Sequence, residues 1–178
     1  MVAESQIDVP THARDRGHCV VAAEVGHLQL APDYFAEAAL IDLDDLEHNT
    51  RDGLHIASLA GAWIAAVAGF GGMRDHDGSL MFTPHLPPAL SRLTFRLCYR
   101  GRRLRVDVGQ TQATYTLRDG PALEITHHDE PVTVTSRHPV TLPLPAAAAG
   151  EAPRQPLGRA PASRAPEIDV DGTGRLAA

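Results

Sequence analysis

The amino-acid sequence predicts an α+β fold in which helices come first and a small antiparallel β-sandwich follows. Apolar side chains recur at helical spacing up to about Met73, and after that point they alternate with polar ones, as in strands. The 15 glycines and 14 prolines mark turns and a long end with almost no large apolar side chain. These observations divide the 178 residues into a disordered leader (1–18), a helical segment (19–73), a β-sandwich (74–145) and a disordered tail (146–178).

The helical segment starts with two short helices. Residues 1–18 are polar and show no periodicity, so we expect the first helix to run from residue 19 to about residue 30, before Pro32 stops or kinks it. A second helix is predicted over residues 34–43. The acidic residues 42–48 that follow indicate a connection facing solvent.

The third helix carries the clearest signal. It is predicted to begin near Thr50 or Asp52, either of which can cap free N–H groups, and to end near Phe70 at a group of glycines. No charged side chain occurs in residues 56–72, so this helix is apolar on every face and needs more neighbours than the chain supplies. One face has small residues and another has large ones: Ala57, Gly61, Ala65 and Gly69, against Leu59, Trp63 and Val67. We therefore expect an inner helix of a larger helical domain, of which this chain is a fragment.

Six strands are predicted in the second half. The clearest pair is residues 93–99 and 103–108, joined by a turn around Gly101, with one core face and one basic face exposed to solvent. The other predicted strands are residues 79–82, 113–117, 122–126 and 132–135. Short turns rich in Asp, Gly and Pro between them indicate an antiparallel sandwich.

Composition excludes several functions. A net charge of −6 and a pI near 5.9 argue against nucleic-acid binding. Cys19 and Cys98 match neither a disulfide framework nor a metal pair, and no signal-peptide pattern opens the chain, so we expect a cytoplasmic protein. The acidic run lacks the spacing of a calcium loop, and His127, His128 and Asp129 do not complete a ligand set, so no metal site is predicted.

Residues 50–55 form the candidate binding site. The N–H groups in the first turn of a helix are unsatisfied and the helix dipole favours negative charge there, so an anion could bind beside Gly53. Arg51 offers a planar donor fork to phosphate oxygens, His55 could add a hydrogen bond, and Thr50 opens the loop. On spacing alone, a plainer interpretation is favoured, in which Thr50 and Asp52 only cap the helix and His55 packs locally.

Several motifs in one order resemble the C-terminal part of glycoside hydrolase family 65. In the helical segment these are DDLEHNTRDGLH at residues 44–55, AGAW at 60–63 and GFGGMR at 69–74. In the sandwich they are DGSL at 77–80, PHLP at 84–87, LTFR at 93–96 and YRGRRLRV at 99–106. The resemblance covers about residues 19–135 and is more specific than any single match.

The resemblance implies the last helices of an (α/α)6 barrel followed by a small antiparallel β-sandwich. Family members act on α-linked glucose disaccharides such as trehalose, maltose or kojibiose, most as inverting phosphorylases and some as hydrolases. The resemblance places their general acid, a Glu, before the segment matched here, so no catalytic residue is assigned. It also implies three partners: the remaining barrel segment, the disaccharide and, in a full-length enzyme, a second subunit of a homodimer.

The resemblance assigns phosphate binding to Thr50, Arg51, Gly53 and His55, with inorganic phosphate as co-substrate and no other cofactor. The loop of the phosphorylases reads approximately Thr-Ser-x-Gly-x-His, so Arg51 replaces the serine expected to donate to phosphate. Arg51 could bind the anion itself, or its bulk could fill the site and leave water as the nucleophile. Phosphorylase and hydrolase therefore both stay open.

Two other classes of protein compete with this interpretation. The sandwich could be a freestanding carbohydrate-binding or structural module. Such modules stack sugars on exposed aromatic rings, and the sandwich has two tyrosines, Tyr99 and Tyr115. Alternation places Tyr99 on the core face. Residues 54–73 contain no acid or Arg, and their length would span a bilayer once. Their many Ala and Gly residues and the missing aromatic belt argue against a membrane helix.

Overall fold

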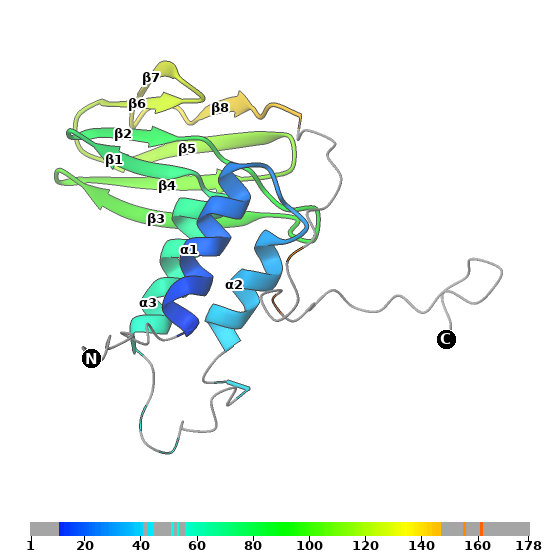
Figure 1. Ribbon diagram of the computed structural model, residues 1–178. Helices are drawn as coiled ribbons and strands as arrows, with labels where there is room; N and C mark the ends of the chain where they lie inside the picture. The colour runs from blue at the N-terminus through cyan, green and yellow to red at the C-terminus, as the bar shows by residue number, and fades with distance from the viewer. Residues whose placement is uncertain are drawn as a thin grey trace, which may run out of the picture.

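The computed structural model describes residues 11–40, 43–44, 51, 53, 56–146, 155 and 161, and it has a layer of helices packed under a β-sandwich (Figure 1). The helices are α1 (Thr11–Glu24), α2 (Ala31–Leu40) and α3 (Ile56–Ile64), and α3 continues as a π-helix, η2 (Ala65–Phe70). The strands are β1 (Met73–His76), β2 (Ser79–Phe82), β3 (Leu93–Tyr99), β4 (Arg102–Val108), β5 (Gln112–Asp119), β6 (Leu123–His127), β7 (Glu130–Val134) and β8 (Val140–Pro143). The predicted fold class, helices followed by a small sandwich, is confirmed.

The sandwich consists of two four-stranded sheets, with strand orders β1-β2-β6-β7 and β3-β4-β5-β8. Every neighbouring pair is antiparallel except β2 and β6, which pair in parallel through two residues. The core between the sheets contains Phe82, whose ring lies 5.2 Å from that of Tyr115 and 6.4 Å from that of Phe95. Three aromatic rings thus anchor a sandwich in which aromatic residues are scarce.

The first two helices begin earlier than predicted. α1 starts at Thr11, so residues 11–18, predicted as part of a disordered leader, are helical. These residues are polar and gave no apolar periodicity, yet they extend the turns in which Cys19 and Ala23 are buried. Pro32 lies in the first turn of α2 rather than ending α1, because proline fits the first turn of a helix, where its missing N–H is not needed.

Three of the four predicted small residues of the third helix, Gly61, Ala65 and Gly69, are buried, whereas Ala57 is exposed. A methyl group added at Gly69 would lie 3.5 Å from the Cα of Val20, so the two backbones approach closely there. The three large side chains predicted to share one face of the helix do not have the same environment. Leu59 and Trp63 are exposed, whereas Val67 is buried. The reason is the π-helix, whose wider turn rotates Val67 away from the line of Leu59 and Trp63.

The strands follow the alternation closely. β2 and β3 have the predicted bounds, and β4 directs Leu104, Val106 and Val108 into the core. β1 and β8 were not predicted, and β8 ends with a proline, which is tolerated at a sheet edge. The predicted tail lies outside the described residues except for Ala146, Gln155 and Pro161.

Candidate functional site

The structure describes two of the four predicted phosphate-binding residues. Arg51 and Gly53 are exposed and precede α3, whereas Thr50 and His55 lie outside the described residues, as does Asp52. α3 begins at the end of the helical layer that is remote from the sheets (Figure 1). The sandwich therefore does not cover the start of this helix.

Gly53 has a backbone suited to close approach by a ligand. Its φ of 134° lies in a region that side chains disfavour, and a Cβ placed there would meet no atom of the described residues within 4 Å. Arg51 already takes part in an interaction within the protein. The described geometry is compatible with an anion at this position, and phosphate binding by residues 50–55 remains a prediction.

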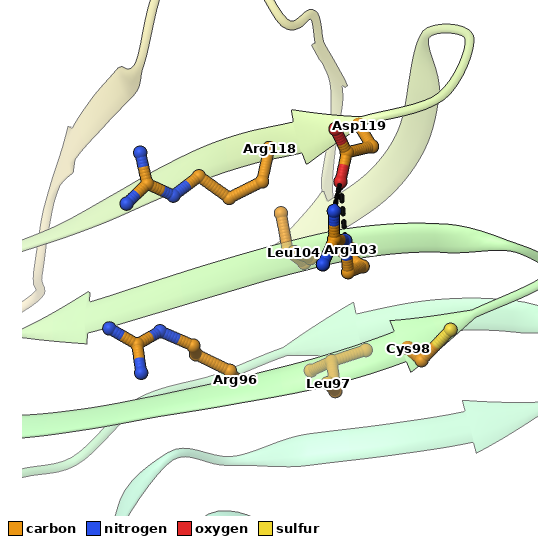
Figure 2. A pocket seen from close by; sticks show the side chains of 7 residues that line it. All are labelled: Arg96, Leu97, Cys98, Arg103, Leu104, Arg118 and Asp119. Carbon is orange, nitrogen blue, oxygen red and sulfur yellow. Dashed lines mark hydrogen bonds and ion pairs between the residues drawn. The ribbon is translucent and has the colours of Figure 1, made fainter.

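A second feature is a hollow on the outer face of β3, β4 and β5, with a volume of about 590 Å³ (Figure 2). Its lining consists of Arg96, Leu97, Cys98, Arg103, Leu104, Arg118 and Asp119. In Figure 2 the side chains of Arg96 and Arg118 extend in the same direction from different strands, while Arg103 pairs with Asp119. Strand alternation had indicated a basic exposed face here, but it could not show that the face is concave.

Beside this hollow, Asp107 is the acceptor for several donors. Thr94 donates to Oδ1 of Asp107 over 2.6 Å, Arg105 contacts the carboxylate at 2.8 Å, and Arg92 also binds it. Burial pushes the pKa of Asp107 upward, but the hydrogen bonds from Thr94, Arg105 and Arg92 outweigh it and hold the pKa below its ordinary value. Asp107 is thus a fixed anion that pairs with both Arg92 and Arg105.

A buried polar pair lies between the sheets. The Tyr115 hydroxyl is 2.7 Å from Nδ1 of His127, and Nε2 of His127 is 3.1 Å from the carbonyl oxygen of Pro143. Because a carbonyl can only accept, Nε2 must donate, so in the neutral ring Nδ1 accepts from the Tyr115 hydroxyl. Burial raises the pKa of Tyr115, which keeps this hydroxyl protonated. The pair satisfies two polar groups of the core and is structural.

The tyrosines of the sandwich are poor platforms for sugar rings. Tyr115 is fully buried, and Tyr99 donates a hydrogen bond of 2.6 Å to the carbonyl of Gly78 while the Arg100 guanidinium lies 5.3 Å from its ring centre. A second hollow of about 870 Å³ near the β1–β2 and β3–β4 turns is lined in part by Tyr99 and Arg100. Stacking of a sugar on the Tyr99 ring would need Arg100 to move first.

A membrane helix and a metal site, both weighed from the sequence, are not found in the described part of the chain. None of its helices has both the length and the apolar character needed to cross a membrane. Within the same residues, no three His, Cys, Asp or Glu side chains are grouped so that they could hold a metal ion.

Comparison with known proteins gives the family. Residues 11–64 match the model of the glycosyl hydrolase family 65 central catalytic domain, and residues 73–134 match that of the family 65 C-terminal domain. An uncharacterized glycosyl hydrolase of Mycobacterium leprae is 53% identical over 92% of this chain and 20% of its own length. The maltose phosphorylase of Bacillus subtilis is 36% identical over 67% of this chain and 16% of its own length.

A solved structure agrees with this assignment. A chain from the human microbiome, provisionally named a kojibiose phosphorylase, superposes with a TM-score of 0.69 at 26% identity, covering 74% of this chain and 19% of that one. The chain described here belongs to glycosyl hydrolase family 65. It spans about a fifth or less of the length of the curated relatives it matches.

Proposed function

We propose that this chain supplies the phosphate- or water-side loop of a site that cleaves α-linked glucose disaccharides with inversion. Thr50, Arg51, Gly53 and His55 would hold the nucleophile, and a Glu on further polypeptide of the catalytic domain would be the proton donor. Alone, the chain would be inactive. Its partners are that polypeptide, the disaccharide and inorganic phosphate, with a homodimer as the assembled state and the cytoplasm as its place.

The observation that carries this proposal is the exposed Gly53 that precedes α3, with a φ of 134° and no described residue within 4 Å of its Cβ position. An anion close to the first turn of a helix is favoured by the positive end of the helix dipole. The family membership adds the reaction class, and relatives named as maltose and α,α-trehalose phosphorylases support a phosphate-dependent reaction.

The chemistry places the nucleophile and the acid on opposite faces of the sugar. The acid protonates the departing oxygen while phosphate, or a water molecule, attacks the anomeric carbon from the other side. A guanidinium at residue 51 can neutralise an anion but is larger than serine. We therefore infer that residue 51 decides between phosphate and water as the nucleophile.

A chimera tests this proposal. Residues 11–146 would replace the matching segment of the maltose phosphorylase of Bacillus subtilis, and formation of glucose and of glucose 1-phosphate from maltose would be measured with and without phosphate. We expect no product from the 178-residue chain alone and product from the chimera. Arg51→Ser should raise the share of glucose 1-phosphate several-fold, because it restores a small donor and frees space.

The matched control is Arg137→Ser, which removes an exposed arginine far along the chain and should leave the product ratio unchanged. Two results would contradict the proposal. The first is cleavage of the disaccharide by the isolated chain, and the second is an identical product ratio in the chimeras with and without the Arg51→Ser substitution.

A further inference from the structure

We propose that the hollow on the outer face of β3, β4 and β5 is a second anion site, which binds a small organic phosphate such as a sugar phosphate. This site is separate from residues 50–55, because it lies on the sandwich and is built from strand residues. It does not depend on the function proposed above.

The first support for this site is an excess of positive charge around the hollow. Arg96, Arg103 and Arg118 line the hollow against one carboxylate, Asp119, which leaves a net charge of +2 in a chain whose total is −6. Asp119 pairs with Arg103, so it is already engaged. Neither Arg96 nor Arg118 forms an ion pair or hydrogen bond with any residue that the structure describes. Two guanidinium groups, one from β3 and one from β5, are therefore available at the hollow.

The second support is the placement of these arginines within the sheet. Arg96 lies directly opposite Arg105 across the β3–β4 pair, and like charges in that position weaken a sheet. Between β4 and β5 the register shifts at Arg103 and Leu104, so Arg118 is the extra residue of an irregularity in β5. Such irregularities redirect side chains. Alternation from the buried Leu117 already directs Arg118 to the exposed face that carries Arg96, and the shift brings Asp119 onto this face opposite Arg103 (Figure 2).

The third support is size and chemistry. A volume of about 590 Å³ exceeds what inorganic phosphate needs and falls within the range of small-molecule sites, roughly 300–1,000 Å³. Guanidinium groups bind phosphate oxygens through paired N–H donors and do so in preference to weaker acceptors. A phosphate group between Arg96 and Arg118, with the rest of the molecule over Leu97 and Cys98, fits this lining.

Cys98 offers a local reporter for the experiment. It is exposed in the hollow, whereas the chain's other cysteine, Cys19, is buried, and burial raises its pKa to about 12. Alkylation of the 178-residue chain by iodoacetamide should therefore follow Cys98. We would measure its rate with glucose 6-phosphate, inorganic phosphate, glucose and, at equal ionic strength, sodium chloride. Saturating glucose 6-phosphate should slow alkylation about five-fold or more, because it would cover the thiol, while glucose and sodium chloride should not.

Variants assign the effect to the arginines. Arg96→Gln and Arg118→Gln should each abolish most of the protection, and the corresponding lysine variants, which keep the charge but lose the fork, should retain part of it. Arg137→Gln removes an exposed arginine elsewhere and should change nothing. Arg51→Gln should also keep full protection, because residue 51 lies outside this hollow. This variant distinguishes the proposed site on the sandwich from phosphate binding at residues 50–55. Circular dichroism checks that each variant is folded. If a glutamine variant is unfolded, the lysine variant at the same position is used to test the proposal.

Several outcomes would overturn the proposal. These are equal protection by glucose or by salt, equal loss in Arg137→Gln, and loss of protection in Arg51→Gln. Protection by an acidic peptide without protection by the sugar phosphate would identify a protein partner for this face instead.

Discussion

At the scale of single residues, His128 shows how local packing sets a charge state. Its ring lies 4.7 Å from that of His127 and 5.6 Å from that of His85, and its Nε2 is buried without a hydrogen-bond partner among the described residues. Burial lowers the pKa of His128 below its ordinary value of 6.5, the rings of His127 and His85 lower it further, and Asp129 opposes them. The folded protein therefore favours the neutral ring.

This shift predicts how stability depends on pH. Between the lowered pKa of the folded state and 6.5, the unfolded chain binds more protons at His128 than the folded chain does. The contribution of His128 is thus complete above about pH 6.5 and is lost as the pH falls through the folded pKa. His128→Asn, which suits the φ of 44° at this position, should make the urea midpoint less dependent on pH between about pH 7.5 and pH 5.5. His138→Asn, at an exposed site, should keep the original slope, and equal slopes in both variants would contradict the role of His128.

At the scale of elements, two glycines show where the backbone limits the fold. Gly101 forms the β3–β4 turn with Arg100, both with positive φ, and a Cβ there would meet nothing within 4 Å. Gly72 joins η2 to β1 with a φ of 59°, and a Cβ there would lie 2.1 Å from the carbonyl oxygen of Thr83. At Gly101 only the positive φ disfavours a side chain. At Gly72 a side chain would also collide with the backbone of Thr83.

The two positions form a matched pair of predictions. Gly101→Ala should lower the free energy of unfolding by about 1–2 kcal/mol, which is the cost of a left-handed alanine. Gly72→Ala should lower it by about 3 kcal/mol or more, because β1 and β2 must also separate at the Thr83 N–H···O=C Gly72 bond of 3.1 Å. Urea unfolding followed by circular dichroism measures both, and equal losses would contradict the predicted closure at Gly72.

The same elements show what the sequence could predict. Alternation located β2 and β3 within their bounds because each strand has one buried and one exposed face. The π-helix could not be predicted, since its sequence, Ala65–Phe70, fits an α-helix equally well and only packing against α1 distinguishes them. At the candidate site, residue types indicated an anion at Gly53 and alternation indicated a basic exposed face, but the pairing of Asp119 with Arg103 on that face depends on a register shift between β4 and β5 that no local pattern specifies.

At the scale of the whole molecule, α3 has an apolar stripe that the described protein leaves uncovered. Ile56, Leu59 and Trp63, spaced by three and four residues, are 67%, 44% and 51% exposed. Exposed apolar patches of this kind mark contacts with other protein. Because residues 11–64 match the family's central catalytic domain and the chain covers about a fifth of its relatives, we infer that further helices of that domain cover this stripe.

This inference predicts that one double substitution affects stability differently in the isolated chain and in the chimera. In the 178-residue chain, Ile56→Gln with Leu59→Gln should reduce binding of a hydrophobic dye and any concentration-dependent self-association, with little change in stability, because both side chains are exposed there. In the maltose phosphorylase chimera the same pair should lower the free energy of unfolding by roughly 3 kcal/mol, since burying two large aliphatic side chains contributes about this much. Glu124→Gln, at an exposed position on the sandwich, should be neutral in both contexts. If the double substitution were harmless in the chimera, another surface would have to join this chain to the rest of the catalytic domain.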